Sequence, residues 1–287
     1  MTIPGLVTVI IPSRNEVYLH RTIRDLLDKA AGDIQIIAIL DGYWPAVQEI
    51  IEDPRVNYLH RSTPCGMRNG INSAVAIAKG EYILKTDAHC MFGVGYDNIL
   101  KDDCAPNWII VPRRYALDPV KWEIEENPKY PIDYMYLSKD LHGMPWTERN
   151  RNLLFEERLI DDLMSAQGSC WFMKKDYYNE LELLDEENWG TFYNEFQEIG
   201  LKCWLSGGLV QVNKKTWYAH WHKPREVGRG YNLPNTEQQK AIDYLNYCVE
   251  LDRLGKRFFK NQVYSIDWLI DKFAPVPTWE GGEANGN

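Results

Sequence analysis

The first ninety positions alternate between two hydrophobic patterns. Four short apolar runs, rich in β-branched residues, predict buried strands at 6–12, 34–40, 56–60 and 81–87. Two segments between them carry apolar residues at helical spacing and predict helices at 18–31 and 67–78. Strands and helices in alternation predict an α/β fold with a mostly parallel sheet and helices on both faces.

The middle of the chain has a different pattern. Residues 117–150 combine prolines with tyrosines and tryptophans, which predicts an irregular, aromatic-rich insertion outside the core. Regular patterns then return and predict a helix at 156–167, a strand at 168–175, an amphipathic helix at 195–206, a strand at 209–212 and a helix at 238–259. We expect a main domain at 1–237, a C-terminal helical extension at 238–279 and a disordered tail at 280–287.

Composition limits the function. The net charge of −9 argues against a protein coated with cations, although 210–262 is locally basic, with ten Lys/Arg against five Asp/Glu. The six cysteines lack the spacing of a zinc site or a disulfide framework, and no apolar run is long enough for a signal or a membrane span. These features predict a cytoplasmic protein without a membrane anchor, and nothing among them indicates an oligomeric state.

Asp87 and His89 follow the fourth predicted strand two residues apart, so their side chains point to the same side of an extended chain. A carboxylate and an imidazole together suit Mn²⁺, or Mg²⁺, and such a cation can bridge two phosphates. The simpler alternative is a strand-end Asp beside a surface His. His220 and His222 repeat the spacing, and either one is a candidate third ligand unless this His-Trp-His segment packs or binds an acceptor.

Several motifs in order carry a resemblance. VTVIIPSRNE, ILDG and GMRNGINSAVAIAKGEYILKTDAH cover about 6–92, and the pattern resumes at Trp189-Gly190 and runs through NEFQEIGLKCWLSGG. Together with a late His, they resemble the GT-A (Rossmann-like) glycosyltransferases of family 2 type, and most of all the polypeptide N-acetylgalactosaminyltransferases. The resemblance implies a GT-A fold, a UDP-sugar donor and a metal at Asp87 and His89.

The resemblance also implies which residues bind the donor. Asp41 would hydrogen-bond the uracil or the ribose, and Gly168 and Ser169 would lie under the donor sugar. The full implied set is Pro12, Arg14, Glu16, Asp41, Gly66, Arg68, Asn69, Gly168 and Ser169.

Catalytic roles are implied for Glu195 and Glu198, on the helix that faces the acceptor. Inverting relatives usually begin this helix with Glu-Asp and use the Asp as the base, whereas this chain has Glu195-Phe196. Either Glu195 is itself the base, or the enzyme retains configuration and needs no protein base. A third reading is that Glu195 only stabilises the first turn of its helix.

The sequence leaves the identity of the acceptor undecided. The strings DGYWP, VPRRYALDP, QGSCWFM and NKKTWYAHWHK resemble compact transferases encoded by viruses and metagenomic sequences, some of which add sugars to hydroxymethylated pyrimidines in DNA. The basic C-terminal region could contact phosphates of double-stranded DNA. A protein or cell-envelope glycan acceptor is the alternative. A nucleotidyltransferase would need a Gly-rich phosphate loop, which PSRNE is not. An inactive binding protein is disfavoured because Asp41, Asp87, His89 and Glu195 are present.

Overall fold

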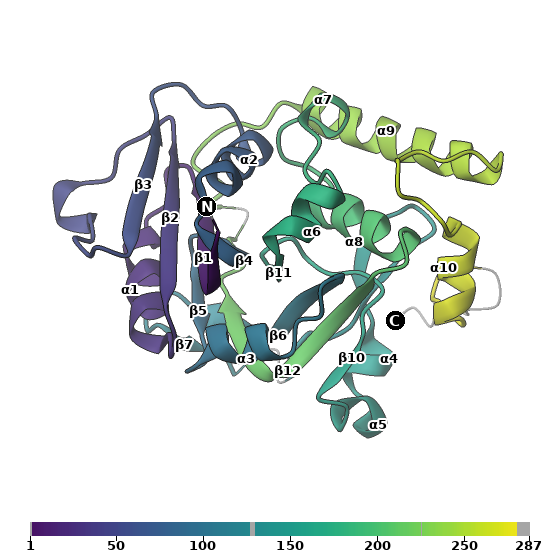
Figure 1. The fold of residues 1–287 in the computed structure, drawn as a ribbon, viewed down its shortest axis with the longest axis horizontal. Coiled ribbons are helices and arrows are strands. Elements are labelled where there is room, and N and C mark those ends of the chain that lie inside the picture. Colours follow the sequence, from purple (N-terminus) through teal and green to yellow (C-terminus); the bar gives the residue numbers. More distant parts are fainter. Residues whose placement is uncertain (1, 127–129, 225, 280–287) are drawn as a thin grey trace.

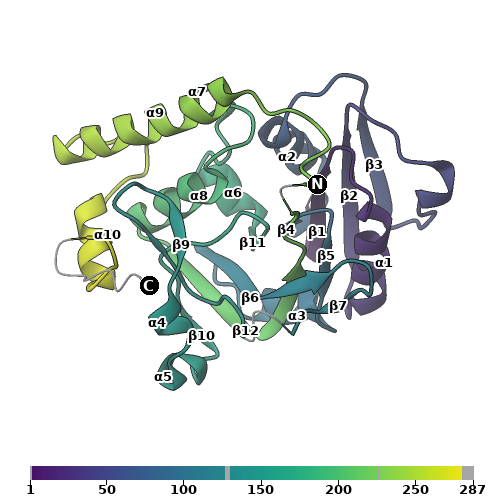
Figure 2. The ribbon, with the colours of Figure 1, turned by 180° about the vertical axis from the view of Figure 1, so that it is seen from behind.

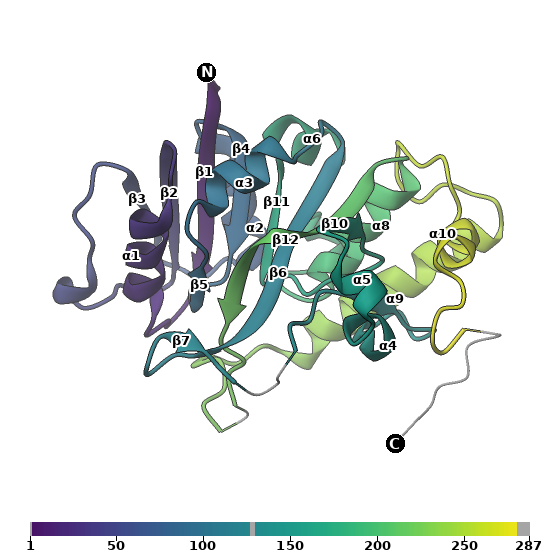
Figure 3. The same cartoon turned by 90° about the horizontal axis from the view of Figure 1, so that it is seen from below.

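The computed structural model describes residues 2–126, 130–224 and 226–279 (Figure 1). These residues form a ten-stranded sheet. Eight of its strands follow the order β10-β12-β6-β11-β4-β1-β2-β3, and the other two, β5 and β7, pair with β12 and β6 respectively. The strands are β1 Ile3–Ser13, β2 Ile34–Asp41, β3 Val56–Arg61, β4 Gly80–Thr86, β5 Cys90–Phe92, β6 Trp108–Asp118, β7 Glu123–Ile124, β10 Ile160–Asp162, β11 Cys170–Lys174 and β12 Leu209–His220. Figure 3 shows them following one another across the molecule.

The N-terminal half matches the prediction from the hydrophobic pattern. β4, β1, β2 and β3 are parallel neighbours, and β2 is buried along its whole length. The helices α1 (Leu19–Lys29), α2 (Met67–Ile77) and α3 (Tyr96–Asp102) connect or follow these strands. Parallel strands with crossover helices place their carboxyl ends at one edge of the sheet, and that edge carries the polar residues described below.

The middle of the chain departs from the prediction. The region 117–150 holds β7, a separate hairpin of β8 (Met135–Leu137) and β9 (Gly143–Pro145), and α4 (Thr147–Asn150). Tyr134, Tyr136 and Trp146 are buried in the main hydrophobic core, so the expectation that this insertion lies outside the core is wrong. Prolines interrupt the periodicity of the segment, but they do not prevent its large aromatic side chains from packing inward.

The helix predicted at 156–167 is also wrong. The short helix α5 (Leu153–Glu156) ends where that helix should begin, and β10 pairs antiparallel with β12. The edge of β12 provides backbone partners for this segment, and tertiary pairing of this kind overrides a weak local helical pattern.

Two further elements differ from their predicted form. β12 continues eight residues beyond 212, with a register shift against β6 between Asn213 and Trp217, and it carries His220 to the sheet edge. Helix α8 (Glu195–Leu205) is buried on nearly every side, so it is not amphipathic. It packs against β12 and α10, and α6 (Lys175–Glu180) and α7 (Glu186–Trp189) precede it in the chain.

The C-terminal helices α9 (Asn235–Arg253) and α10 (Ile266–Phe273) lie at the end of the molecule away from β2 and β3 (Figure 2). Leu245, Val249, Leu269 and Phe273 belong to the same core cluster as the sheet. The predicted tail at 280–287 lies outside the described residues. Over the described part of the chain, no helix is both long enough and apolar enough to cross a membrane.

Candidate functional site

A cavity of about 1140 Å³ opens at the carboxyl ends of β1, β2 and β4. Its walls also come from the start of α8, the end of β12 and the segments 221–224 and 228–234. Most of the site residues expected from the sequence line it: Pro12, Arg14, Glu16, Asp41, Gly66, Asp87, His89, Gly168, Ser169, Glu195, His220 and His222.

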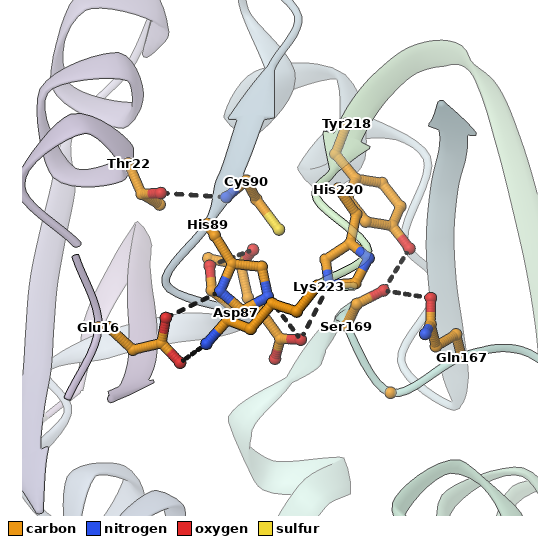
Figure 4. Close-up of polar contacts among 12 residues, drawn as sticks. Glu16, Thr22, Asp87, His89, Cys90, Gln167, Ser169, Tyr218, His220 and Lys223 are labelled. Atoms are coloured by element: carbon orange, nitrogen blue, oxygen red, sulfur yellow. Dashed lines mark hydrogen bonds and ion pairs between the residues drawn. The ribbon is translucent and has the colours of Figure 1, made fainter. Parts of the chain in front are cut away.

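Asp87, His89 and His220 offer ligand atoms within 4.8 Å of one another. Oδ2 of Asp87 lies 3.2 Å from Nε2 of His220 and 3.9 Å from Nε2 of His89. The pairing of His220 with Cys90 across β12 and β5 brings the third residue to the other two, although it lies 131 positions after His89. Figure 4 shows the group between the Glu16–Lys223 pair and Ser169. His222 lies outside this group.

His220 is suited to ligate a cation. It is 5% exposed, its Nδ1 makes no hydrogen bond with the described residues, and its Nε2 faces Oδ2 of Asp87. Burial lowers the pKa of His220 to about 3, so the ring is neutral at pH 7 and has a lone pair to donate. Burial would raise the pKa of Asp87, but Lys85 and His220 lower it well below its usual range and keep the carboxylate charged. One oxygen and two nitrogen ligands fit a divalent cation such as Mn²⁺.

Glu16 orients the second histidine. Its Oε2 lies 3.1 Å from Nδ1 of His89, and its Oε1 accepts from Nζ of Lys223 at 2.5 Å. Burial alone would raise the pKa of Glu16, but His89 and Lys223 lower it. A carboxylate on one ring nitrogen leaves the other free to bind a metal, and such partners strengthen ligation.

Lys85 is a site residue that the sequence analysis missed. Its Nζ lies 2.8 Å from Oδ1 of Asp87, 2.5 Å from the Gly168 carbonyl and 3.3 Å from Oε2 of Glu195. These two carboxylates raise its pKa despite full burial. The sequence pattern could have identified Lys85. This lysine interrupts the apolar run of β4 two residues before Asp87, so its side chain points to the same face of the strand as Asp87.

Glu195 begins α8 and faces the cavity. Its Oε1 accepts from the Trp171 indole at 2.8 Å, and burial raises the pKa of the carboxyl. A Cβ at position 168 would lie 2.4 Å from Oε2 of Glu195, so a larger residue there would displace the Glu195 carboxylate from this position. Gly168, Lys85 and Glu195 therefore form one packed unit under the cavity.

Three residues expected at the site do not line the cavity. Glu198 is fully buried, where it pairs with Arg68 and accepts from Nζ of Lys202 at 2.8 Å. Arg68 is equally buried, and its pair with Glu198 joins α2 to α8. Asn69 donates to Glu186 at 2.7 Å, away from the cavity wall. The motif spacing placed all three on the correct helices, but their side chains point into packed contacts.

Asp41 reaches the cavity but is already engaged. Its two carboxylate oxygens accept from the backbone N–H groups of Cys65 at 2.8 Å and Gly66 at 3.0 Å. Gly66 has φ +91°, a conformation that favours glycine. Asp41 thus holds the loop before α2 against the end of β2.

Known proteins resemble this chain in sequence and in fold. The family model described as glycosyl transferase family 2 matches residues 8–182. Glycosyltransferase GlyG of Streptococcus pneumoniae serotype 4 is 30% identical over an alignment of 197 residues, which covers 61% of this chain and 59% of that protein.

A solved structure of GalNAc-T7 with UDP, GalNAc and Mn²⁺ superimposes with a TM-score of 0.69 at 16% identity, over 93% of this chain and 56% of that one. At this identity the likeness shows the fold, and it confirms the predicted GT-A architecture. The chain spans somewhat more than half the length of both relatives.

Proposed function

Because the chain belongs to glycosyltransferase family 2, we propose that it is a metal-dependent enzyme that transfers a sugar from a UDP-sugar to a hydroxyl group. The observation that carries this proposal is the Asp87–His89–His220 group, with a buried neutral histidine, at the wall of a cavity large enough for a nucleotide sugar. The solved GalNAc-T7 structure, which contains UDP and Mn²⁺, supports the same donor and metal.

The residues of this site have different proposed roles. Asp87, His89 and His220 would hold Mn²⁺ or Mg²⁺, and the ion when bound neutralises charge on the departing diphosphate. Glu16 orients His89, and Lys85 fixes Asp87 relative to the Gly168 carbonyl. Preorganised contacts of this kind cost no rearrangement during the reaction.

The donor base lies, in our proposal, at the ends of β1 and β2. Pro12, Arg14 and Asp41 line that part of the cavity, and Asp41 shapes it by holding Gly66. Each carboxylate oxygen keeps a second lone pair, so Asp41 can accept from the uracil N–H or from a ribose hydroxyl.

Glu195 stands beside the proposed sugar position. We propose that its carboxylate acts on the acceptor side, either as the base of an inverting reaction or as the charge that aligns the acceptor in a retaining one. The resemblance to a retaining family favours retention. NMR of the product decides, because a β-linkage from an α-linked donor would exclude retention.

The acceptor we propose is a hydroxyl, with hydroxymethylated DNA as the more specific case and a protein or cell-envelope glycan as the alternative. Support for DNA from charge is limited. Of the basic residues that the structure describes between 210 and 262, Lys223 and Arg229 line the cavity, and Lys223 is paired with Glu16. Lys215 is paired with Asp103, and Lys214 is buried.

The test is release of UDP from a panel of UDP-sugars in Mn²⁺, with and without hydroxymethylated DNA and neutral glycans. EDTA should stop release and added Mn²⁺ should restore it. Asp87→Asn should abolish it, whereas Asp28→Asn, an exposed carboxylate on α1, should leave it unchanged. Undiminished release in EDTA would refute the metal-dependent reaction.

A further inference from the structure

Arg114 is a buried arginine in the cavity wall that the proposed reaction has not used. It lies on β6 opposite Tyr218 of β12, is 5% exposed and lines the cavity. Among the described residues, its guanidinium bonds to the amide oxygen of Gln167 and lies 3.7 Å from the sulfur of Met135. Both partners are neutral, although a guanidinium offers five N–H donors.

Among the described residues, no carboxylate forms an ion pair with Arg114. The buried bases Arg68, Lys85 and Lys202 each contact a carboxylate, whereas no ion pair to Arg114 exists within the described ranges. Lys214 is another buried base without an ion pair, but it donates to a backbone carbonyl and does not line the cavity. Burying an unpaired charge is costly, so an anion from outside the chain would stabilise this position.

The neighbouring residue shows what ordinary pairing looks like on this strand. Arg113 points to the opposite face of β6, where its Nη2 lies 2.7 Å from Asp133 and 2.8 Å from Glu156. Two adjacent arginines therefore differ in one respect that matters here. Arg113 forms ion pairs with two carboxylates, whereas Arg114 faces the open cavity.

Arg114 lies next to the position proposed for the transferred sugar. Oε1 of Gln167 accepts from both Arg114 and the Ser169 hydroxyl. Ser169 in turn contacts the Tyr218 hydroxyl at 2.8 Å, as Figure 4 shows. Tyr218 is two residues before His220 on the same strand. One hydrogen-bonded link therefore separates the guanidinium from Ser169.

We propose that Arg114 forms an anion subsite for a carboxylate or phosphate carried by one of the two sugar substrates. A guanidinium binds such groups through two parallel hydrogen bonds, which adds geometric selection to the charge. The anion belongs either to an acidic donor sugar, such as a hexuronic acid, or to an acidic acceptor. This inference rests on the proposed function and narrows its substrate class.

The donor arm compares UDP-glucose with UDP-glucuronate by calorimetry in Mn²⁺. If the donor carries the anion, the wild-type protein should bind UDP-glucuronate at least about tenfold more tightly, the usual strength of a charged hydrogen bond. Arg114→Met should remove the difference and leave the affinity for UDP itself unchanged. Arg113→Met is the matched control and should keep the preference, while its melting temperature falls because two carboxylates lose their partner.

The acceptor arm uses a neutral UDP-sugar with pairs of acceptors that differ by one carboxylate or phosphate. If the acceptor carries the anion, kcat/KM should favour the acidic member by about tenfold, and Arg114→Met should again abolish the preference. If Arg114→Met does not fold, Arg114→Gln takes its place in both arms.

Two results would overturn the inference. One is a wild-type protein with no preference for an acidic substrate in either arm. The other is loss of UDP affinity in Arg114→Met, which would assign the guanidinium to the diphosphate. Failure of UDP to bind the wild-type protein in Mn²⁺ is a separate outcome, because it would contradict the proposed function as a whole.

Discussion

Two carboxylates one turn apart on α8 have different surroundings. Glu195 faces the cavity and is held by Trp171 and Lys85, whereas Glu198 is enclosed by Arg68 and Lys202. Both belong to the same sequence motif, so spacing alone assigns them the same role. Their surroundings indicate chemistry for the first and packing for the second.

Matched amide substitutions should separate these roles. Glu195→Gln should lower turnover by about 10²–10⁴-fold if the carboxylate takes the acceptor proton, with UDP affinity unchanged. Glu198→Gln should lower the free energy of unfolding by about 3–5 kcal/mol, because it leaves buried bases without their partner. Steady-state kinetics, UDP calorimetry and urea unfolding measure the three quantities. Normal turnover in Glu195→Gln would reduce Glu195 to a helix-stabilising residue.

At the scale of elements, β12 decides which late histidine joins the metal group. Its last residue, His220, pairs with β5, directly after Asp87 and His89. His222 lies beyond the strand and 4.6 Å from His220, ring to ring, outside the ligand group.

Alanine at each histidine tests this assignment. His220→Ala should raise the Mn²⁺ concentration needed for half-maximal UDP binding by at least about tenfold, because a direct ligand is lost. His222→Ala should change it little. A titration of Mn²⁺ at fixed UDP measures both variants. The reverse order of effects would identify His222 as the ligand.

The aromatic insertion is a second element whose role depends on burial. Trp146 is 4% exposed, packs edge to face against Tyr136 at 5.7 Å and carries the guanidinium of Arg149 at 3.7 Å. Tyr130, in the same segment, is 47% exposed.

Truncating these two aromatics should therefore have unequal effects. Trp146→Ala should cost about 3–5 kcal/mol of stability, as large core truncations do. Tyr130→Ala should stay within about 0.5 kcal/mol of the wild type, as surface changes do. Urea unfolding of both variants measures the difference. If both variants lost equally little stability, the insertion would not be part of the hydrophobic core.

For the whole molecule, one core cluster extends from the N-terminal sheet to α10. Leu26 of α1 and Leu269 of α10 belong to that cluster, and Asp252 links α9 to the next segment by accepting from Gln262 at 2.5 Å and from the Ile266 N–H at 2.7 Å. A continuous core favours cooperative unfolding, so the C-terminal helices should not melt separately.

Scanning calorimetry should show one transition for the wild-type chain. Leu26→Ala and Leu269→Ala, at opposite ends of the molecule, should each lower that same transition, by about 2–5 kcal/mol in stability. A separate early transition in Leu269→Ala alone would show that the C-terminal segment is an independent unit.

Local features of the sequence were sufficient to predict the N-terminal sheet and two of the three members of the metal group. A strand buried on both faces must be apolar along its length, so the runs that became β1, β2 and β4 could be identified directly. Asp87 and His89 were identifiable because they are two residues apart at a strand end, where extended geometry puts both on one side.

Contacts between distant segments were decided only by the tertiary structure. The choice of His220 depends on the pairing of β12 with β5 and on the irregular register after Asn213. Arg68 meets Glu198 across 130 positions, and Arg114 keeps an open cavity while Arg113 is paired. Periodicity reports which face of an element is apolar, but it does not report which element covers that face. Burial and pairing of polar groups therefore follow from packing, which depends on the whole chain.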